Sequence, residues 1–569
     1  MQRRLRSRQF HLPPSLKSKT PKPGRLLIRY AQLASQGRPQ LAFLSTPLAR
    51  NHQFRYLTTK RKRWLVYEVF LGLKYTVYFW AILGCSLVAY CSVQQEYLER
   101  RYPTPPEWAF LTRLRLRFAK WGPDWLETDW VVTGEYVTNV IERLEDKNID
   151  GAGLEDLTEG GTWIDGIGKS GYDITAKSEP WRRGYYDALV LSATAAEQLD
   201  DEVLDTTRHL VFPASTVIGP SNPNPRPIPF GSESAPREEN CERAYEKPEI
   251  VYMRILTTRG FSSRQKMDAA LAYASWLDFK GTPDAALRMY EWALSLASEN
   301  VPPTEVPYDR QSYTLRDDAR APSTNILTAL TALAAHKARN EDVSTALPIL
   351  LSVLRARRSL PEPQAATPSH ESQAPADSPW AVRNIISTVK RIATPPAHPP
   401  APDDGESAPV RDAKERCEEA GLNLYIGEII YASNKGTSKG REDGLAWTRE
   451  AVDLAEEQLH KLSPGAGDAD AKKTCTDCLA SGLENWAKMV TRLAREEREK
   501  EESASGSSSG SWFALGLWGD AGKAETTTTT TPSRWAAEEN VVKERTRRAQ
   551  EVLDDLEVPI TPFSWFFTA

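Results

Sequence analysis

Two cysteines separated by two residues, Cys475 and Cys478, have the spacing in this sequence that could support the most specific chemistry. A C-x-x-C pair can exchange disulfides, with adjacent cations such as Lys472 and Lys473 lowering the thiol pKa, or it can supply half of a zinc site. Neither function is complete here, because no βαβ pattern surrounds the pair and no second pair of ligands follows at zinc spacing. Redox catalysis, a structural disulfide that involves Cys417, and simple packing in a core remain open, and packing is the interpretation we favour.

Other residues that could do chemistry do not form a site. GIGKS at residues 166–170 has the end of a phosphate-binding loop, but Trp163 stands where that motif needs its first glycine, and no apolar strand precedes it. The seven histidines are scattered without an H-E-x-x-H pattern, and we expect His336 to be a packing residue of a helix. The sequence therefore predicts no catalytic, metal-binding or cofactor-binding residue, no small-molecule substrate and no enzyme activity.

The N-terminal segment is strongly basic. Residues 1–63 contain sixteen Lys and Arg and no Asp or Glu, although the whole chain has a formal net charge of −4. A basic, acid-free, hydroxyl-bearing segment without an apolar core is typical of a mitochondrial transit peptide, which we place at residues 1–57 because Arg55-Tyr56-Leu57 resembles a matrix processing site. A basic cytosolic tail is the alternative. The acidic remainder of the chain argues against a nucleic acid partner.

An uncharged, apolar stretch of nineteen residues follows, from Tyr75 to Val93. This length is enough to cross a hydrocarbon core of about 30 Å. We predict a membrane anchor over residues 64–95 and not a permease, because one span cannot surround a transport pathway. With a transit peptide and the basic run Lys60–Arg63 before the span, the sequence predicts a single-pass protein of the mitochondrial inner membrane, its N-terminus in the matrix and its C-terminal body in the intermembrane space.

Residues 96–150 are predicted to form juxtamembrane helices. The segment from Glu107 to Trp121 is basic and amphipathic, so it either lies on anionic lipid or packs against the next helix, and the sequence favours neither. A proline-rich stretch, Ile218–Pro236, interrupts the helical pattern further on. We interpret it as a long loop across its own domain, with recruitment of a proline-reading domain as the alternative.

Two helical segments, 267–280 and 283–297, are joined by a very short turn. Gly281 ends the first helix, and Pro283 suits the first turn of the second. Helices connected so tightly must lie antiparallel, and small residues between them let their axes approach closely. One hairpin cannot bury both of its faces, so further hairpins are required.

Matching segments recur at 325–354 and 421–459, and a fourth pair is predicted to begin at Cys478 and to end after Trp535. Glu341 takes the position of the turn glycine in the second pair. The predicted packing positions are Ala274, Gly281, Ala286, Tyr290, Ala293, Ala334, Ala346, Gly427, Gly444 and Ala451. Their spacing resembles that of the tetratricopeptide repeat, which implies an all-α fold, a tetratricopeptide-like helical-hairpin solenoid.

The repeats are expected in two parts, residues 171–360 and 411–500. Residues 361–410 are rich in Pro and residues 501–532 in Ser and Thr. Neither segment can bury enough apolar surface to offset its chain entropy, so we expect both to be disordered insertions. Residues 533–569 are predicted to form a C-terminal helix and an aromatic tail.

Stacked hairpins expose a concave surface formed by their first helices, and such a surface suits an extended or helical segment of another protein. We therefore expect protein partners, held by contacts along a groove. By repeat geometry, the expected groove residues are Leu271, Ser275, Asp278, Phe279, Leu424, Glu428 and Tyr431.

Three segments, KSEPWRRGYYDALV, GPSNPNPRP and LTTRGFSSRQKMDAALAYASWLDFKG, resemble a fungal family related to the tetratricopeptide adaptor subunit of the mitochondrial inner-membrane i-AAA protease. Some members of that family carry a misleading maltose permease label. The resemblance covers roughly residues 60–460 and implies an adaptor that binds the i-AAA protease and delivers unfolded proteins to it. Two other functions stay open: an assembly or import factor for respiratory-chain subunits, and a thiol oxidoreductase that uses Cys475 and Cys478.

Overall fold

The computed structural model describes residues 46–124, 129–156, 171–231, 233–316, 321–363, 398–434, 438–462, 469–508 and 534–556. Several expectations concern residues outside this part of the chain. They are those for most of the transit peptide, for GIGKS, for most of the two insertions and for the aromatic tail. The chain divides into two units, Met1–Ser92 and Val93–Ala569.

One long helix, α1 (Thr46–Arg101), accounts for the described residues of the first unit and continues into the second. From Lys60 to Arg101 it is long and apolar enough to cross a membrane, and in the described part of the chain it is the one helix that is. The predicted anchor, residues 64–95, lies within it. The hydroxyls of Thr76 and Ser92 donate to backbone oxygens four residues earlier, both at 2.8 Å, so these polar groups are satisfied inside the helix.

The second unit is mostly helical, in agreement with the predicted fold class. Its first helices pack on one another in chain order: α2 (Phe110–Trp121), α3 (Trp130–Glu145), α4 (Glu179–Gln198) and α5 (Pro248–Thr257). Glu145 joins α3, α4 and α5, because it accepts hydrogen bonds from the Tyr185 hydroxyl and the Arg254 guanidinium, both at 2.9 Å. Burial raises the pKa of this carboxyl, and the two donors hold it in place.

Short strands lie among these helices. They form an antiparallel pair and an antiparallel three-stranded sheet with the order β4-β3-β5: β1 (Glu155–Asp156), β2 (Tyr172–Asp173), β3 (Glu202–Asp205), β4 (Leu210–Pro213) and β5 (Cys241–Arg243). Strands of two to four residues are too short to produce an alternating pattern, so the sequence gives no signal for them. Single-turn 3-10 helices are η1 (Gly122–Asp124), η3 (Ala214–Thr216) and η4 (Glu238–Asn240). The two ends of the proline-rich stretch lie side by side, because the Ile218 amide donates a hydrogen bond to the Pro236 oxygen at 3.0 Å.

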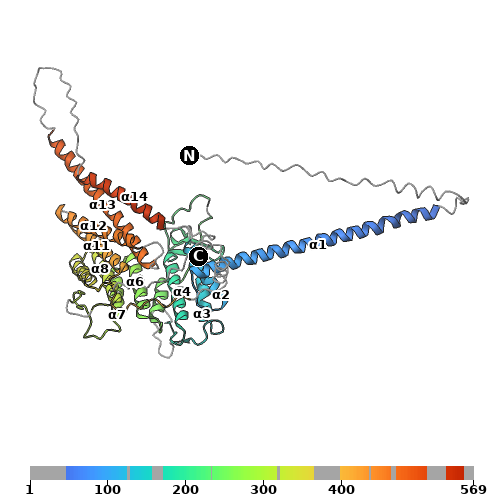
Figure 1. The fold of residues 1–569 in the computed structure, drawn as a ribbon, viewed down its shortest axis with the longest axis horizontal. Helices are drawn as coiled ribbons and strands as arrows, with labels where there is room; N and C mark the ends of the chain where they lie inside the picture. The colour runs from blue at the N-terminus through green and yellow to red at the C-terminus, as the bar shows by residue number, and fades with distance from the viewer. Residues whose placement is uncertain are drawn as a thin grey trace, which may run out of the picture. The chain divides into compact units, whose positions relative to one another are not determined.

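The rest of the second unit consists of helices that pack as consecutive hairpins, each hairpin against the next (Figure 1). The helices are α6 (Ser263–Phe279), α7 (Pro283–Ala297), α8 (Thr324–Arg339), α9 (Val343–Arg358), α11 (Ala413–Ser433), α12 (Ser438–Lys461), α13 (Ala469–Ser508) and α14 (Arg534–Leu556). The hairpins are α6–α7, α8–α9, α11–α12 and α13–α14. Because α13 continues to Ser508, the first residues of the second expected insertion, 501–508, are helical.

The turns inside the first two hairpins have the same conformation. Gly281 has φ +74°, and Glu341, at the equivalent position, has φ +66°. Each turn is closed by the amide of the next residue, which donates to the carbonyl five residues earlier: Thr282 to Leu277 at 3.0 Å and Asp342 to Lys337 at 2.9 Å. The missing glycine therefore does not change the turn, although a side chain in the left-handed region costs about 1 kcal/mol.

Hairpin α11–α12 is held together by a close helix crossing. An added Cβ at Gly427 would lie 2.8 Å from the Gly444 oxygen, and one at Gly444 would lie 2.7 Å from the Gly427 oxygen. Backbone meets backbone here, so neither helix can accept a side chain at the crossing without moving.

We expect Gly427→Ala to lower the free energy of unfolding by about 1–3 kcal/mol, since the clash outweighs the better helix propensity of alanine. Gly421, in the same helix, is the matched control: its Cβ would meet nothing within 4 Å, so Gly421→Ala should stabilise by about 0.5–1 kcal/mol. Urea unfolding of the two variants, followed by circular dichroism, measures both effects. If both variants raised the free energy of unfolding by the same amount, the helices would not cross at Gly427.

Residues 398–410, within the first expected insertion, are ordered against the N-terminus of α8. The Thr324 amide donates to the Ser407 oxygen and the Asn325 amide to the Gly405 oxygen, each at 3.1 Å. The first amides of a helix have no partner inside it, and this segment supplies carbonyls for them. The expectation of a disordered insertion over 361–410 therefore does not hold for residues 398–410.

Candidate functional site

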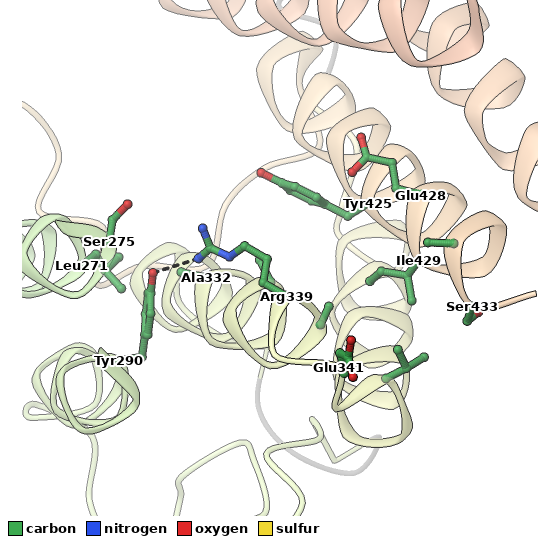
Figure 2. A pocket seen from close by; sticks show the side chains of 14 residues that line it. Leu271, Ser275, Tyr290, Ala332, Arg339, Glu341, Tyr425, Glu428, Ile429 and Ser433 are labelled. Carbon is green, nitrogen blue, oxygen red and sulfur yellow. Dashed lines mark hydrogen bonds between the residues drawn. The ribbon is translucent and has the colours of Figure 1, made fainter. Parts of the chain in front are cut away.

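A cavity of about 780 Å³ lies between α6, α8 and α11, the helices that begin three successive hairpins. Figure 2 shows Leu271 and Ser275 of α6 on one side of it and Tyr425, Glu428 and Ile429 of α11 on the other. Three alanines of α8, Ala332, Ala335 and Ala338, lie between them, and Arg339 at the end of the helix is the other α8 residue of the lining. The lining residues are Leu271, Ser275, Tyr290, Ala332, Ala335, Ala338, Arg339, Glu341, Val343, Tyr425, Glu428, Ile429, Ala432 and Ser433.

A second cavity of about 500 Å³ adjoins the first and shares Ala332, Ala335 and Tyr425 with it. It extends from α8 and α11 to α13 and is more polar. Its lining residues are Arg264, Thr328, Thr331, Ala332, Ala335, Arg357, Lys414, Glu418, Gly421, Leu422, Tyr425, Asp470, Lys473, Thr474 and Asp477. We call the two cavities together the groove. It has an apolar, aromatic middle and charged residues of both signs toward its ends.

A polar network fixes one end of the groove. Asp278 of α6 accepts from His336 Nδ1 at 2.8 Å and from Arg339 at 2.9 Å, both on α8. The hydroxyl of Tyr290, on α7, donates to the same carboxylate at 3.2 Å and accepts from Arg339 at 3.1 Å. Burial raises the pKa of Tyr290, and the neighbouring Asp278 carboxylate raises it further. The network therefore ties the first hairpin to the second and holds the Arg339 side chain at the groove.

The opposite wall of the groove carries a carboxyl and a phenol of altered pKa. Burial raises the pKa of Glu428, whose carboxylate also accepts a hydrogen bond from Asn485 of α13, and burial raises the pKa of Tyr425. No nucleophile lies beside a base in this lining, and no group of three His, Cys, Asp or Glu in the described residues could hold a metal ion. The lining combines apolar surface with a few hydrogen-bonding groups, a combination found in ligand-binding pockets.

Of the groove residues expected on α6, Leu271 and Ser275 line the cavity, and Asp278 and Phe279 do not. Asp278 is turned into the network described above. Phe279 is 82% exposed at the end of α6, beside the turn to α7. The part of α6 that lines the groove therefore includes two of the four residues expected there.

Of the groove residues expected on α11, Glu428 lines the cavity, whereas Leu424 and Tyr431 are buried. The Tyr431 hydroxyl donates to the Met489 oxygen of α13 at 3.2 Å. Leu424 and Tyr431 are three residues before and four after Gly427, so they share the helix face that carries the close crossing with α12. The groove face is rotated by about one residue, or about 100°, to Tyr425, Ile429 and Ala432.

That rotation could have been found from the sequence. Gly427 was assigned to packing against the partner helix, and residues at i−3 and i+4 from it must face the same way. Tyr425 is two residues away from Gly427 and so points elsewhere. The alanines of α8 that line the groove carry no such signal, because alanine occurs both in packed positions and at the surface of helices.

The predicted packing residues lie where helices approach one another. Tyr290 is 3% exposed, and the alanines of the set are not exposed at all: Ala274, Ala286, Ala293, Ala334, Ala346 and Ala451. Gly427 and Gly444 form the crossing of α11 and α12, and Gly281 forms the turn between α6 and α7.

The cysteines are arranged differently from a C-x-x-C redox pair. Cys475 of α13 forms a disulfide with Cys417 of α11, 58 residues earlier, and both are buried. Cys478 is a free, buried thiol whose pKa burial raises to about 12, so it holds little reactive thiolate near neutral pH. Of the interpretations left open, the structural disulfide with Cys417 is the one observed, and our preference for simple packing was wrong for Cys475.

Comparison with protein-family models, with curated proteins and with solved structures finds no match to this chain.

Proposed function

We propose that the chain is a membrane-anchored scaffold of the tetratricopeptide class, without enzyme activity, whose groove binds a segment of another protein. The observation that carries this proposal is the cavity of about 780 Å³ lined by the first helices of three successive hairpins. Its alanine surface on α8 admits a polypeptide backbone closely, while Tyr425 and Tyr290 offer rings and hydroxyls at its edges. Such a surface binds by many weak contacts along its length, as helical-repeat proteins do.

The proposed location is the mitochondrial inner membrane, with the N-terminus in the matrix and the second unit in the intermembrane space. Two features support it: the basic, acid-free N-terminal segment and the apolar part of α1 from Lys60 to Arg101. The Cys417–Cys475 disulfide is a third, since structural disulfides persist in oxidising compartments and are rare where thiols are kept reduced.

The proposed partners are the i-AAA protease and unfolded proteins of the inner membrane or the intermembrane space. This part of the proposal is supported by the resemblance of three segments to the fungal adaptor family. An assembly or import factor for respiratory-chain subunits would use the same groove. The thiol oxidoreductase is not favoured, because Cys475 is held in a buried disulfide and Cys478 is a buried thiol of raised pKa.

We expect Ala335→Trp to block partner binding, because Ala335 lines both cavities and an indole there obstructs the groove where they join. Tagged full-length chain is purified from mitochondria in mild detergent, and recovery of co-purifying proteins should fall by about tenfold. Ala272→Trp is the matched control, since Ala272 is exposed on α6 and does not line the groove.

The co-purifying proteins decide between the two partner classes. A hexameric ATP-dependent protease supports the adaptor, and translocase or respiratory-chain subunits support the assembly factor. Undiminished recovery of either class with Ala335→Trp would mean that the groove is not the binding surface.

A further inference from the structure

The outward face of α2 is apolar, exposed at its N-terminal end and half-buried further along. Positions 110, 111, 114 and 118 share one side of this helix and carry Phe, Leu, Leu and Phe. The Phe110 side chain is 63% exposed and the Leu111 side chain 50%. Helix α3 extends this surface, because the rings of Phe118 and Tyr136 lie 6.2 Å apart and Val132, one turn earlier, is 45% exposed.

The opposite face of α2 is firmly packed. The Thr112 hydroxyl donates to Asp150 at 2.6 Å, and the Ala109 amide donates to the same carboxylate at 2.8 Å. Leu116 and Ala119 are buried against the neighbouring helices. The helix therefore has a fixed rotation, and the exposed apolar side chains cannot turn inward without breaking these contacts.

Helix α2 is also fixed to the last turns of α1. Arg117 donates to the Gln95 side chain at 3.1 Å, and Arg113 donates to Glu99 at 2.9 Å. Leu98, between them, is 2% exposed. These contacts lie in the second unit, on the part of α1 that follows the uncharged stretch.

The position of these contacts along α1 gives a distance from the membrane. Gln95 and Glu99 are two and six residues beyond Val93, where the uncharged stretch ends. At a rise of about 1.5 Å per residue, the α1 residues that accept these hydrogen bonds lie about 3–9 Å beyond Val93, the end of the uncharged stretch. The headgroup layer on one side of a bilayer is about 5–8 Å thick. For a hydrocarbon core that ends at Val93, Gln95 and Glu99 fall in the headgroup layer, and α2 is tied to them by its arginines.

We propose that the apolar face of α2, together with Val132 and Tyr136 of α3, lies in the interface of the bilayer that α1 crosses. This inference rests on the proposed membrane anchor. Phe and Leu on the face of an interfacial helix insert into the boundary between headgroups and acyl chains. A single span leaves the attached body free to tilt, and a second contact beside it restrains the body and the groove.

The test uses the full-length chain in vesicles of radiolabelled phosphatidylcholine, with the photoreactive residue p-benzoylphenylalanine placed at one position at a time. At Phe110 it should cross-link to lipid about tenfold more than at Phe279, a phenylalanine of the second unit on α6 that is more exposed than Phe110. Tyr78, in the apolar part of α1, reports on the anchor itself.

The outcomes separate this inference from the proposed anchor. If position 78 cross-links to lipid but position 110 does so no more than position 279, the inference is overturned and the anchor stands. Cross-links from Phe110 to protein instead of lipid also overturn it, because the face is then covered by a partner. If the photoreactive residue at position 78 does not cross-link to lipid, the proposed anchor is wrong and the inference is wrong with it.

Discussion

Removal of the disulfide between Cys417 and Cys475 should lower the free energy of unfolding by about 4 kcal/mol. The bond closes a loop of 58 residues, and in the chain-entropy treatment a loop of this size stabilises the folded state by roughly that amount, between the values for short and very long loops. The bond also joins α11 and α13, two helices that line the second cavity of the groove. The double variant Cys417→Ala/Cys475→Ala makes the change without leaving an unpaired thiol.

Urea unfolding of the detergent-solubilised full chain measures this effect, with and without a reducing agent. The wild-type chain should lose stability on reduction, whereas the double variant should be insensitive to it. Cys241→Ala is the control, because Cys241 is a free thiol on β5, outside the hairpins. A wild-type chain that keeps its stability under full reduction would contradict the expected contribution.

The elements of the hairpins could be predicted because their signals are local. The expected segments 267–280 and 283–297 correspond to α6, Ser263–Phe279, and α7, Pro283–Ala297. The glycine and the proline that separate them act on their own backbone, whatever the rest of the chain does. Glu341 lacks the conformational freedom of the glycine expected at that position, yet it adopts the same left-handed turn.

The rotation of each helix about its axis was harder to predict, because a shift of one residue turns the exposed face by about 100°. On α11 the hydrophobic pattern alone does not give this rotation, and the signal in the sequence is Gly427, which crosses Gly444 seventeen positions away. Leu424 looks like a groove residue by spacing and Tyr431 like an aromatic contact. Both side chains are instead buried in the core beside the crossing.

Contacts between distant segments left no trace in the sequence pattern. Nothing near Cys475 indicates that its partner is Cys417 instead of Cys478, since pairing depends on how α11 and α13 pack. The 398–410 segment is similarly rich in proline and reads as disordered, but its carbonyls satisfy the first amides of α8. Such pairings require the three-dimensional structure.

Replacement of Arg357 by methionine should destabilise the chain by about 3–5 kcal/mol. Arg357 of α9 pairs with Glu415 of α11 at the joint of the second and third hairpins, and the two side chains are 4% and 7% exposed. Methionine keeps the packing volume but leaves Glu415 as a buried carboxylate without its counter-ion, and this loss is expensive in a low-dielectric interior. The double variant Arg357→Met/Glu415→Leu should recover most of the stability, because no charge is then left uncompensated.

The pH dependence of the Arg357→Met variant distinguishes an unpaired charge from a simple loss of packing. Burial already raises the pKa of Glu415 above its ordinary value of 4.5, and Glu418 and Asp412 raise it further, while Arg357 lowers it. Without Arg357 the folded-state pKa rises more, whereas the unfolded value stays ordinary. The loss in the free energy of unfolding is therefore full at neutral pH. It shrinks as the pH falls through the folded-state pKa of Glu415 and disappears below the unfolded-state pKa.

Urea unfolding at about pH 7.5 and about pH 5 measures this dependence, and the stability of the variant should approach that of the wild type at the lower pH. Arg495→Met, which removes an exposed ion pair on α13, should differ little from the wild type at either pH. A deficit that stays constant between the two pH values means that the stability came from the packing of the Arg357 stem and not from its charge.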